Sequence, residues 1–254
     1  MCGPQLCYTM PVLQAFGRTF KITVEVNGKA KEEFVKDGQT WIAVKPGETF
    51  QVKAEAEADP SLKDKYYHGL QLALDGQDVY WYGFDGRGYA YTFVGYDTQG
   101  DGTKIAAFKF GEPGEEAGGN RADALGITVT AQLWRDSTEP YVHVPTSTPD
   151  GSKRCKKFYQ PHVEAGDEID VGSNSAGFGD RATHMHKAVG KKSFVCSIRY
   201  ATVEGLAIRG VVSRETHPHL FDDKKSRKHR AARSPLVKDE PKAKKAKPEV
   251  IEIE

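Results

Sequence analysis

Two histidine pairs come closer than any other residues in this chain to the spacing of a reactive site. His184 and His186, like His217 and His219, place two imidazoles one residue apart, and imidazole is a common ligand of transition metals. Neither pair has a third ligand at a recognisable spacing. We therefore expect no metal ion and no cofactor.

The segment from Asp97 to Gly102 begins like a calcium-binding loop, with oxygen-bearing side chains at alternate positions and glycine at the sixth. Phe108 stands at the twelfth position, where such a loop requires a bidentate glutamate, and no helices are expected on either side. We interpret the segment as a hairpin turn.

The sequence offers no recognisable nucleophile. It lacks the GxSxG pattern, in which a serine occupies a strained turn between a strand and a helix. Its four cysteines, Cys2, Cys7, Cys155 and Cys196, form no CxxC pair, so we interpret them as free thiols in a reducing compartment. We expect a protein without enzymatic activity, and an enzyme with an unrecognised pocket is the remote alternative.

The stretch from Tyr66 to Tyr96 holds more than a third of the aromatic rings. Within it, Arg87 to Val94 begins like the aromatic octapeptide of RNA-recognition domains, with Tyr89, Tyr91 and Phe93 on one strand face. Such domains also need two amphipathic helices, whereas the neighbours of this stretch have the pattern of strands. We expect the three rings to lie in a β-sheet core, and base stacking by them is the alternative.

Three consecutive aromatic residues, Tyr80, Trp81 and Tyr82, belong to the same stretch. Successive side chains of a strand point to opposite faces, so at least one of these rings points away from the core unless both faces are covered. We predict that an exposed aromatic patch at these residues is the place to look for a partner-binding surface.

Alternation of apolar and polar residues predicts strands through most of the chain. Phe20, Ile22, Val24 and Val26 alternate with polar residues, and Asn27-Gly28 follows as a two-residue hairpin turn. Further short strands, each closed by turn residues, are predicted at 31–36, 40–44, 49–57, 67–74, 79–82, 89–94, 104–110, 126–134 and 193–202. This pattern favours an all-β fold, an antiparallel β-sandwich of jelly-roll type.

The expected organisation is one domain with extensions. Residues 1–17 form an N-terminal extension, residues 18–214 form the β-sandwich, and residues 215–254 form a disordered basic tail. Within the domain the periodicity fades from 136 to 192, which predicts a long irregular excursion. The looser spacing from Val203 to Val211 predicts a short closing helix.

The N-terminus carries none of the common membrane or export signals. It lacks a basic segment followed by an apolar core, and no window approaches the roughly 20 apolar residues of a spanning helix. Cys2 stands where a myristoylation site requires glycine. We expect a soluble intracellular protein that does not interact with membranes.

The C-terminal tail carries most of the functional information. Its basic residues form two clusters separated by a spacer, as in a bipartite nuclear-import signal, and the protein is expected in the nucleus with an import receptor as a partner. The same charges can hold nucleic acid weakly and nonspecifically. The clusters are Lys224, Lys225, Arg227, Lys228, Arg230 and Arg233, and then Lys242, Lys244, Lys245 and Lys247.

Three further short motifs lie in the tail. Lys238 has the context of a SUMO acceptor lysine, and Ser234 before a proline is a candidate phosphorylation site whose added charge would weaken the import clusters. Val250, Ile251 and Ile253 beside acidic residues resemble a SUMO-interacting motif, which binds by adding a strand to a sheet edge. A terminal strand that docks on its own domain is the alternative for this last segment.

Several landmarks occur in an order that resembles a known family. They are Val26 to Gly28 at a hairpin, Trp41, Leu74 to Gly76, Phe108 to Gly111, Trp134-Arg135, Lys157 to Tyr159, and Arg199-Tyr200 followed by Glu204 to Leu206. The order resembles an uncharacterised domain-of-unknown-function family of fungal, and some algal and protist, proteins over roughly residues 16–212. The resemblance implies a β-sandwich-like domain with a basic nuclear-type tail, and it implies no activity, cofactor or catalytic residue.

Taken together, the motifs predict a non-enzymatic nuclear protein whose domain binds another protein and whose tail carries its address. A nucleic-acid-binding protein that uses the basic tail and the face of Tyr89, Tyr91 and Phe93 is the rival hypothesis.

Overall fold

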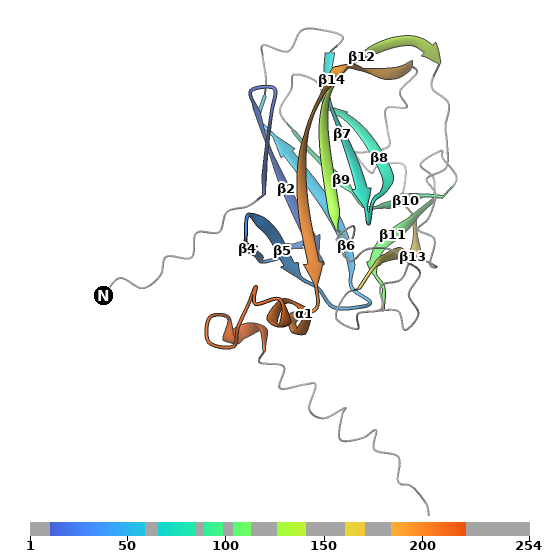
Figure 1. Cartoon of the computed structure of the whole chain (residues 1–254). Helices are drawn as coiled ribbons and strands as arrows, with labels where there is room; N and C mark the ends of the chain where they lie inside the picture. Colours follow the sequence, from blue (N-terminus) through green and yellow to red (C-terminus); the bar gives the residue numbers. More distant parts are fainter. Residues whose placement is uncertain are drawn as a thin grey trace, which may run out of the picture.

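The computed structural model describes residues 11–58, 66–84, 89–98, 104–112, 126–140, 161–170 and 184–221. Their strands form two sheets packed face to face, with one short α-helix beneath the end of the second sheet (Figure 1). The predicted all-β sandwich is confirmed.

The first sheet has eight strands. Its central path is β1 (Val12–Ala15), β2 (Arg18–Val26), β6 (Thr49–Ala56), β11 (Lys104–Phe110) and β10 (Gly95–Asp97). Three more strands pair with members of this path: β3 (Lys29–Ala30) with β2, β9 (Tyr89–Phe93) with β6, and β13 (Val163–Asp170) with β11.

The second sheet has six strands. Their order is β4 (Glu33–Lys36), β5 (Gln39–Ala43), β14 (His184–Ala201), β12 (Ile127–Pro140), β7 (Tyr66–Leu74) and β8 (Gln77–Phe84). The pair β5 and β14 is parallel, which corrects the expectation of purely antiparallel pairing. The tight Asp37-Gly38 turn makes β4 and β5 an antiparallel hairpin. Of these two strands, β5 is the one that pairs with β14, and the two run in the same direction.

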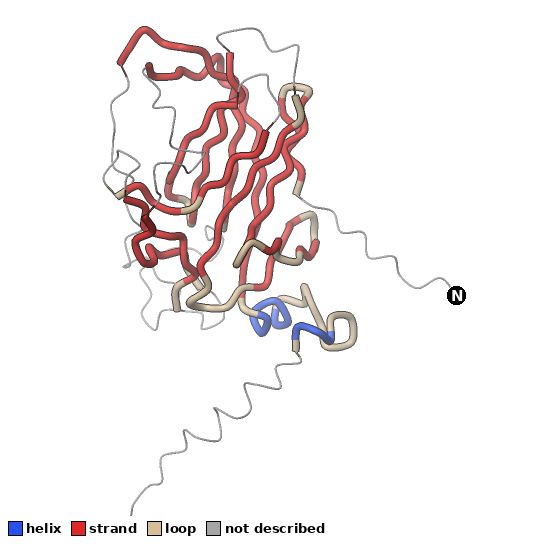
Figure 2. Tube along the Cα trace, turned by 180° about the vertical axis from the view of Figure 1, so that it is seen from behind, coloured by secondary structure: helices blue, strands red, loops and turns tan. Residues whose placement is uncertain are grey.

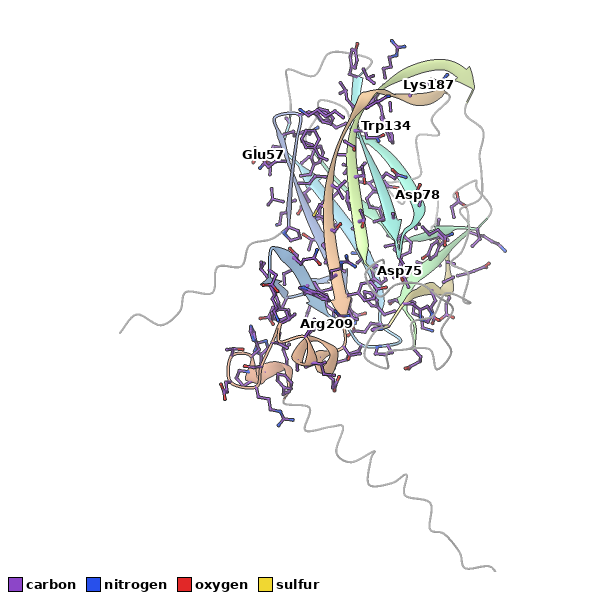
Figure 3. The ribbon with its side chains drawn as sticks, viewed as in Figure 1. Glu57, Asp75, Asp78, Trp134, Lys187 and Arg209 are labelled. Carbon is purple, nitrogen blue, oxygen red and sulfur yellow. The ribbon has the colours of Figure 1, made fainter. Side chains whose placement is uncertain are left out.

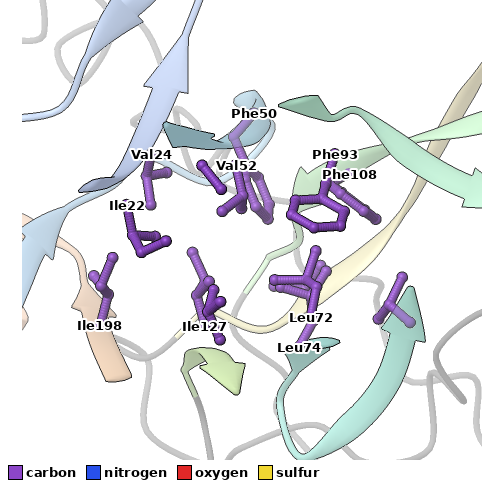
Figure 4. Close-up of a cluster of buried hydrophobic side chains, with 14 of the residues drawn as sticks. Ile22, Val24, Phe50, Val52, Leu72, Leu74, Phe93, Phe108, Ile127 and Ile198 are labelled. Atoms are coloured by element: carbon purple, nitrogen blue, oxygen red, sulfur yellow. The ribbon is translucent and has the colours of Figure 1, made fainter. Parts of the chain in front are cut away.

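The core fills the space between the two sheets (Figure 4). Ile22 and Val24 from β2 face Ile127 and Ile198 from the second sheet, and all four are at most 1% exposed. Alternate residues of each strand point inward because the side-chain period of a strand is two. Burial of a Leu, Ile or Phe side chain contributes about 1.5–3 kcal/mol, so this layer is the main source of stability.

Tight turns are set by residues with positive φ. Asn27-Gly28, Asp37-Gly38 and Asp75-Gly76 all have both residues in the left-handed region, as two-residue hairpin turns of type I′ require, and these turns match the prediction.

A further left-handed pair, Phe16 and Gly17, joins β1 to β2. Its β1 strand lies inside the predicted N-terminal extension, so that boundary is wrong: Leu13 and Ala15 are core residues. The turn is absent from the sequence pattern because phenylalanine rarely adopts positive φ. Here its ring stacks on His68 at 5.7 Å between centroids and meets Phe194 edge-on, and these contacts offset the backbone strain.

The strand predicted at 31–36 is β4, which begins at Glu33 and belongs to the second sheet. Lys29 and Ala30 pair with β2, after which the chain crosses to the second sheet and β4 pairs with β5. The chain leaves β2 because β1 pairs with the rest of that edge, from Arg18 to Lys21. Phe34 is buried, and it packs against the C-terminal segment instead of in the space between the sheets.

The irregular excursion predicted at 136–192 contains regular structure. β12 continues to Pro140, β13 occupies Val163–Asp170, and β14 begins at His184. The predicted closing helix is α1 (Val203–Ile208), and the described fold continues beyond residue 214 to the short 3-10 helix η2 (Pro218–Leu220) and Phe221 (Figure 2). Leu220 and Phe221 pack against the cluster of Phe34 and Leu206.

Candidate functional site

The aromatic stretch from Tyr66 to Tyr96 spans β7 to β10. Tyr91 and Phe93 are 3% and 2% exposed and meet edge-on at 4.8 Å between ring centroids. Tyr96 is fully buried and meets Phe108 in the same manner at 5.0 Å. The core position predicted for Tyr91 and Phe93 is therefore confirmed, and neither ring is available to stack on a base; the side chain of Tyr89 lies outside the described residues.

The three consecutive aromatic residues lie on β8. Within the described residues β8 pairs with β7 alone, so it forms one edge of the second sheet. By backbone register Trp81 pairs with Gln71, whereas Tyr80 and Tyr82 pair with the buried Leu72 and Leu70. The side chains of the three aromatic residues lie outside the described part of the chain.

The two histidine pairs lie far apart in the fold. His184 and His186 begin β14, opposite Pro140 and Asp136, and their side chains lie outside the described residues. His219 Nε2 lies 2.6 Å from Glu32 Oε2 at the surface. Among the described residues no three His, Cys, Asp or Glu side chains are grouped as a metal site would need.

His217 and His219 help to attach the C-terminal segment, residues 203–221, to the second sheet. The His217 ring meets Phe34 edge-on at 5.0 Å, and the Arg209 guanidinium lies 5.0 Å from the centre of the Trp41 ring. Lys36 Nζ donates a hydrogen bond to the carbonyl oxygen of Arg209. These contacts hold Phe221, the residue from which the tail continues, beside β4 and β5.

All of the motifs predicted in the tail lie beyond Phe221, outside the described residues. They comprise the two basic clusters, the acceptor-like Lys238, the phosphorylation candidate Ser234, and the SUMO-interacting-like Val250, Ile251 and Ile253.

A buried polar pair that sequence reasoning missed lies where β2 meets β7. Arg18 and His68 are 4% and 1% exposed, and Arg18 Nη1 lies 3.3 Å from His68 Nδ1. Arginine can only donate, so Nδ1 accepts and the imidazole is neutral in this arrangement. The Arg18 guanidinium also lies 5.5 Å from the centre of the Phe20 ring, a cation–π distance. No local sequence motif indicates this pair, because the two residues come from different sheets.

Asp75 is the second residue whose role the sequence did not reveal. Its Oδ1 accepts hydrogen bonds from Tyr200 Oη at 2.5 Å and from Gly126 N at 2.9 Å, and its Oδ2 accepts from Val163 N at 2.7 Å. Its own N–H donates to the Gly126 carbonyl at 2.8 Å. We call Asp75, Gly126, Val163 and Tyr200 the Asp75 cluster. The Asp-Gly turn was predicted, but its distant partners leave no local pattern.

The surroundings of Asp75 favour the protonated form of its carboxyl more than water does. Burial raises the pKa of the Asp75 carboxyl from 3.8 to about 6, and hydrogen bonds from Tyr200, Val163 and Gly126 limit the rise. Tyr96 faces the same charge, since burial and then the charge of Asp75 raise the pKa of its hydroxyl. Tyr96 Oη is buried and has no hydrogen-bond partner among the described residues. Figure 3 shows Asp75 at the end of the sandwich nearer Arg209 and α1.

A second perturbed carboxyl, Glu33, lies on β4. Burial raises its pKa from 4.5 to about 7, against an opposing effect of Lys21, and its Oε2 is buried without a hydrogen-bond partner among the described residues. Burial, and then the charge of Glu33, raise the pKa of the free Cys196 thiol to about 11. Cys196 is therefore protonated near neutral pH, and a thiol in that state is a poor nucleophile.

The comparisons with known proteins add no relative. No helix among the described residues is both long and apolar enough to span a membrane. No family model, no curated protein and no solved structure matches the chain.

Proposed function

We propose that this chain is a non-enzymatic nuclear protein whose β-sandwich binds a protein partner and whose C-terminal tail directs import. The observation that carries the binding role is the position of β8, an eight-residue strand that contains three consecutive aromatic residues and forms one edge of the second sheet as far as the structure describes it. An edge strand offers backbone N–H and C=O groups to an added strand. Aromatic residues at such an edge supply contact area at low conformational cost.

The import role rests on charge. The tail beyond Phe221 contains the two basic clusters from Lys224 to Arg233 and from Lys242 to Lys247, whereas the chain as a whole has a net charge of only +1. An extended basic segment of this kind fits the acidic groove of an import receptor. Phosphorylation at Ser234 would weaken this contact, while Lys238 and the segment from Val250 to Ile253 would connect the protein to SUMO.

The binding role is tested by affinity capture with the full chain and two variants. Trp81→Glu places a charge on the proposed edge, and Val195→Glu is the matched control, since Val195 is 59% exposed on β14 in the interior of the same sheet. We expect Trp81→Glu to lose the captured partners and Val195→Glu to keep them. If both variants captured the partners equally well, β8 would not be the binding edge.

The import role is tested by fusing the full chain to a fluorescent carrier too large to diffuse through the nuclear pore. We expect nuclear accumulation of the full chain, and loss of accumulation both for a chain ending at Phe221 and after replacement of Lys242, Lys244, Lys245 and Lys247 by alanine. A tail-deleted fusion that still accumulates in nuclei would contradict the assignment.

The nucleic-acid hypothesis is separated from this one by a salt titration. Binding through the tail must weaken steeply as salt rises, because each phosphate contact releases counterions. The burial of Tyr91 and Phe93 leaves the tail as the supported nucleic-acid contact. Absence of binding to DNA and RNA at low salt would eliminate this rival.

A further inference from the structure

The carboxylate of Asp75 connects the two sheets of the sandwich. Val163 opens β13, which belongs to the first sheet, whereas Tyr200 lies on β14 and Gly126 leads into β12 of the second sheet. Two carboxylate oxygens therefore hold three segments that are distant in sequence. The contact to Val163 is the one hydrogen bond of the Asp75 cluster that crosses between the sheets.

The groups that face Asp75 are tyrosines and backbone amides. Tyr200 donates from β14, and Tyr96 of β10 is close enough for the charge of Asp75 to affect it. On the side of β13, His162 precedes Val163 and its Nε2 lies 3.5 Å from Glu164 Oε2. β12 contributes no charged residue beside the cluster, and Asp78, on the same hairpin as Asp75, is exposed.

The free energy needed to ionise the Asp75 carboxyl depends on whether the cluster is closed or open. In the closed cluster the effect of burial outweighs that of the three donors, so the carboxyl keeps its proton to a higher pH than an exposed aspartate does. An opening that admits water restores the ordinary acidity of an aspartate. By linkage, a proton then stabilises the closed form, and removal of the proton favours the open form.

We propose that Asp75 is a pH-sensitive connection between the two sheets, which is held closed when its carboxyl is protonated and opens at Val163 when the carboxyl is ionised. Acid therefore tightens this end of the sandwich. Ionisation loosens the start of β13, which among the described strands pairs with β11 alone and has the exposed residues Asp167, Glu168 and Ile169.

The test is amide hydrogen exchange of the full chain, followed by NMR from pH 5 to pH 7.5 and corrected for intrinsic exchange. We expect the opening constant at Val163 to rise about tenfold over this range and to level off above about pH 7, as the two pKa values of a closed and an open aspartate require. The amide of Val129, in the interior of β12, serves as the reference and should not change. A flat profile at Val163, or an equal rise at Val129, would overturn the proposal.

Three variants complete the test. Asp75→Asn removes the titrating group, so the profile at Val163 becomes flat, whereas Asp78→Asn removes an exposed carboxyl of the same hairpin and leaves the wild-type profile. Tyr200→Phe removes a donor that favours the ionised carboxylate, so the midpoint moves to higher pH. If Asp75→Asn does not fold, the direction of the Tyr200→Phe shift decides: an unmoved or lowered midpoint contradicts the proposal.

Discussion

Gly69 and Gly83 are cross-strand partners on β7 and β8, but their surroundings differ sharply. A Cβ at Gly69 would lie 2.0 Å from the indole ring of Trp134, whereas a Cβ at Gly83 would meet Tyr67 at 3.5 Å, an ordinary contact. Trp134, labelled in Figure 3, is only 5% exposed and cannot move freely. We expect Gly69→Ala to destabilise the fold by about 1–3 kcal/mol, measured by urea unfolding.

Gly83→Ala is the matched control for this substitution, because it adds the same methyl group one strand away. We expect it to change the unfolding free energy by less than about 1 kcal/mol. Equal losses in the two variants would show that strand propensity, and not the contact with Trp134, decides the result.

Glu33 makes stability depend on pH near neutrality. Its pKa is about 7 in the fold and 4.5 when exposed, so the folded state holds the proton more tightly between these values. The penalty for ionising Glu33 is absent below about pH 4.5, grows as the pH rises, and is complete above about pH 7. Relative to Glu33→Gln, the wild type should lose roughly 1–3 kcal/mol between pH 5 and pH 8, measured by chemical denaturation.

Glu57→Gln is the control for the pH profile, since Glu57 is an exposed carboxyl after β6. This variant should follow the wild type at every pH. A wild-type profile parallel to that of Glu33→Gln would mean that Glu33 is hydrated in solution.

At the scale of the element, α1 depends on its N-terminal cap. Thr202 Oγ1 accepts a hydrogen bond from Gly205 N at 3.2 Å and thereby satisfies one of the free amides of the first turn. We expect Thr202→Ala to cost about 1 kcal/mol in urea unfolding and Thr202→Ser to retain most of the stability. Similar losses in both would point to the methyl group of threonine instead of its hydroxyl.

Elements encoded by local pattern were predictable, and those decided by distant contacts were not. Alternation of Phe20, Ile22 and Val24 identified β2, and Asn27-Gly28 identified its turn. Nothing local identifies β1, because the Phe16-Gly17 turn depends on a ring contact with His68. The site was less predictable than the fold, since the partners of Asp75 come from three other segments.

At the scale of the whole molecule, the domain boundary predicts how truncation acts. Leu220 and Phe221 pack against the cluster of Phe34 and Leu206, whereas the composition of the segment after them predicts a disordered tail. A chain ending at Phe221 should unfold at the same urea concentration as the full chain. A chain ending at Arg214, near the boundary predicted from sequence, loses Leu220, Phe221 and the contact of His219 with Glu32, and should be less stable by about 1–3 kcal/mol.

The parallel pairing of β5 with β14 also determines the order in which the fold can be completed. Thr40 to Ala43 pair with Ile198 to Ala201, so the first hairpin of the second sheet cannot complete its pairing until the last strand of the described chain has formed. During synthesis β4 and β5 leave the ribosome long before β14 exists, and contacts between such distant segments form slowly. In a nascent chain that lacks β14, β5 is paired with β4 alone, and its other edge, at Trp41 and Ile42, has no partner. This interval is when the protein most needs a chaperone.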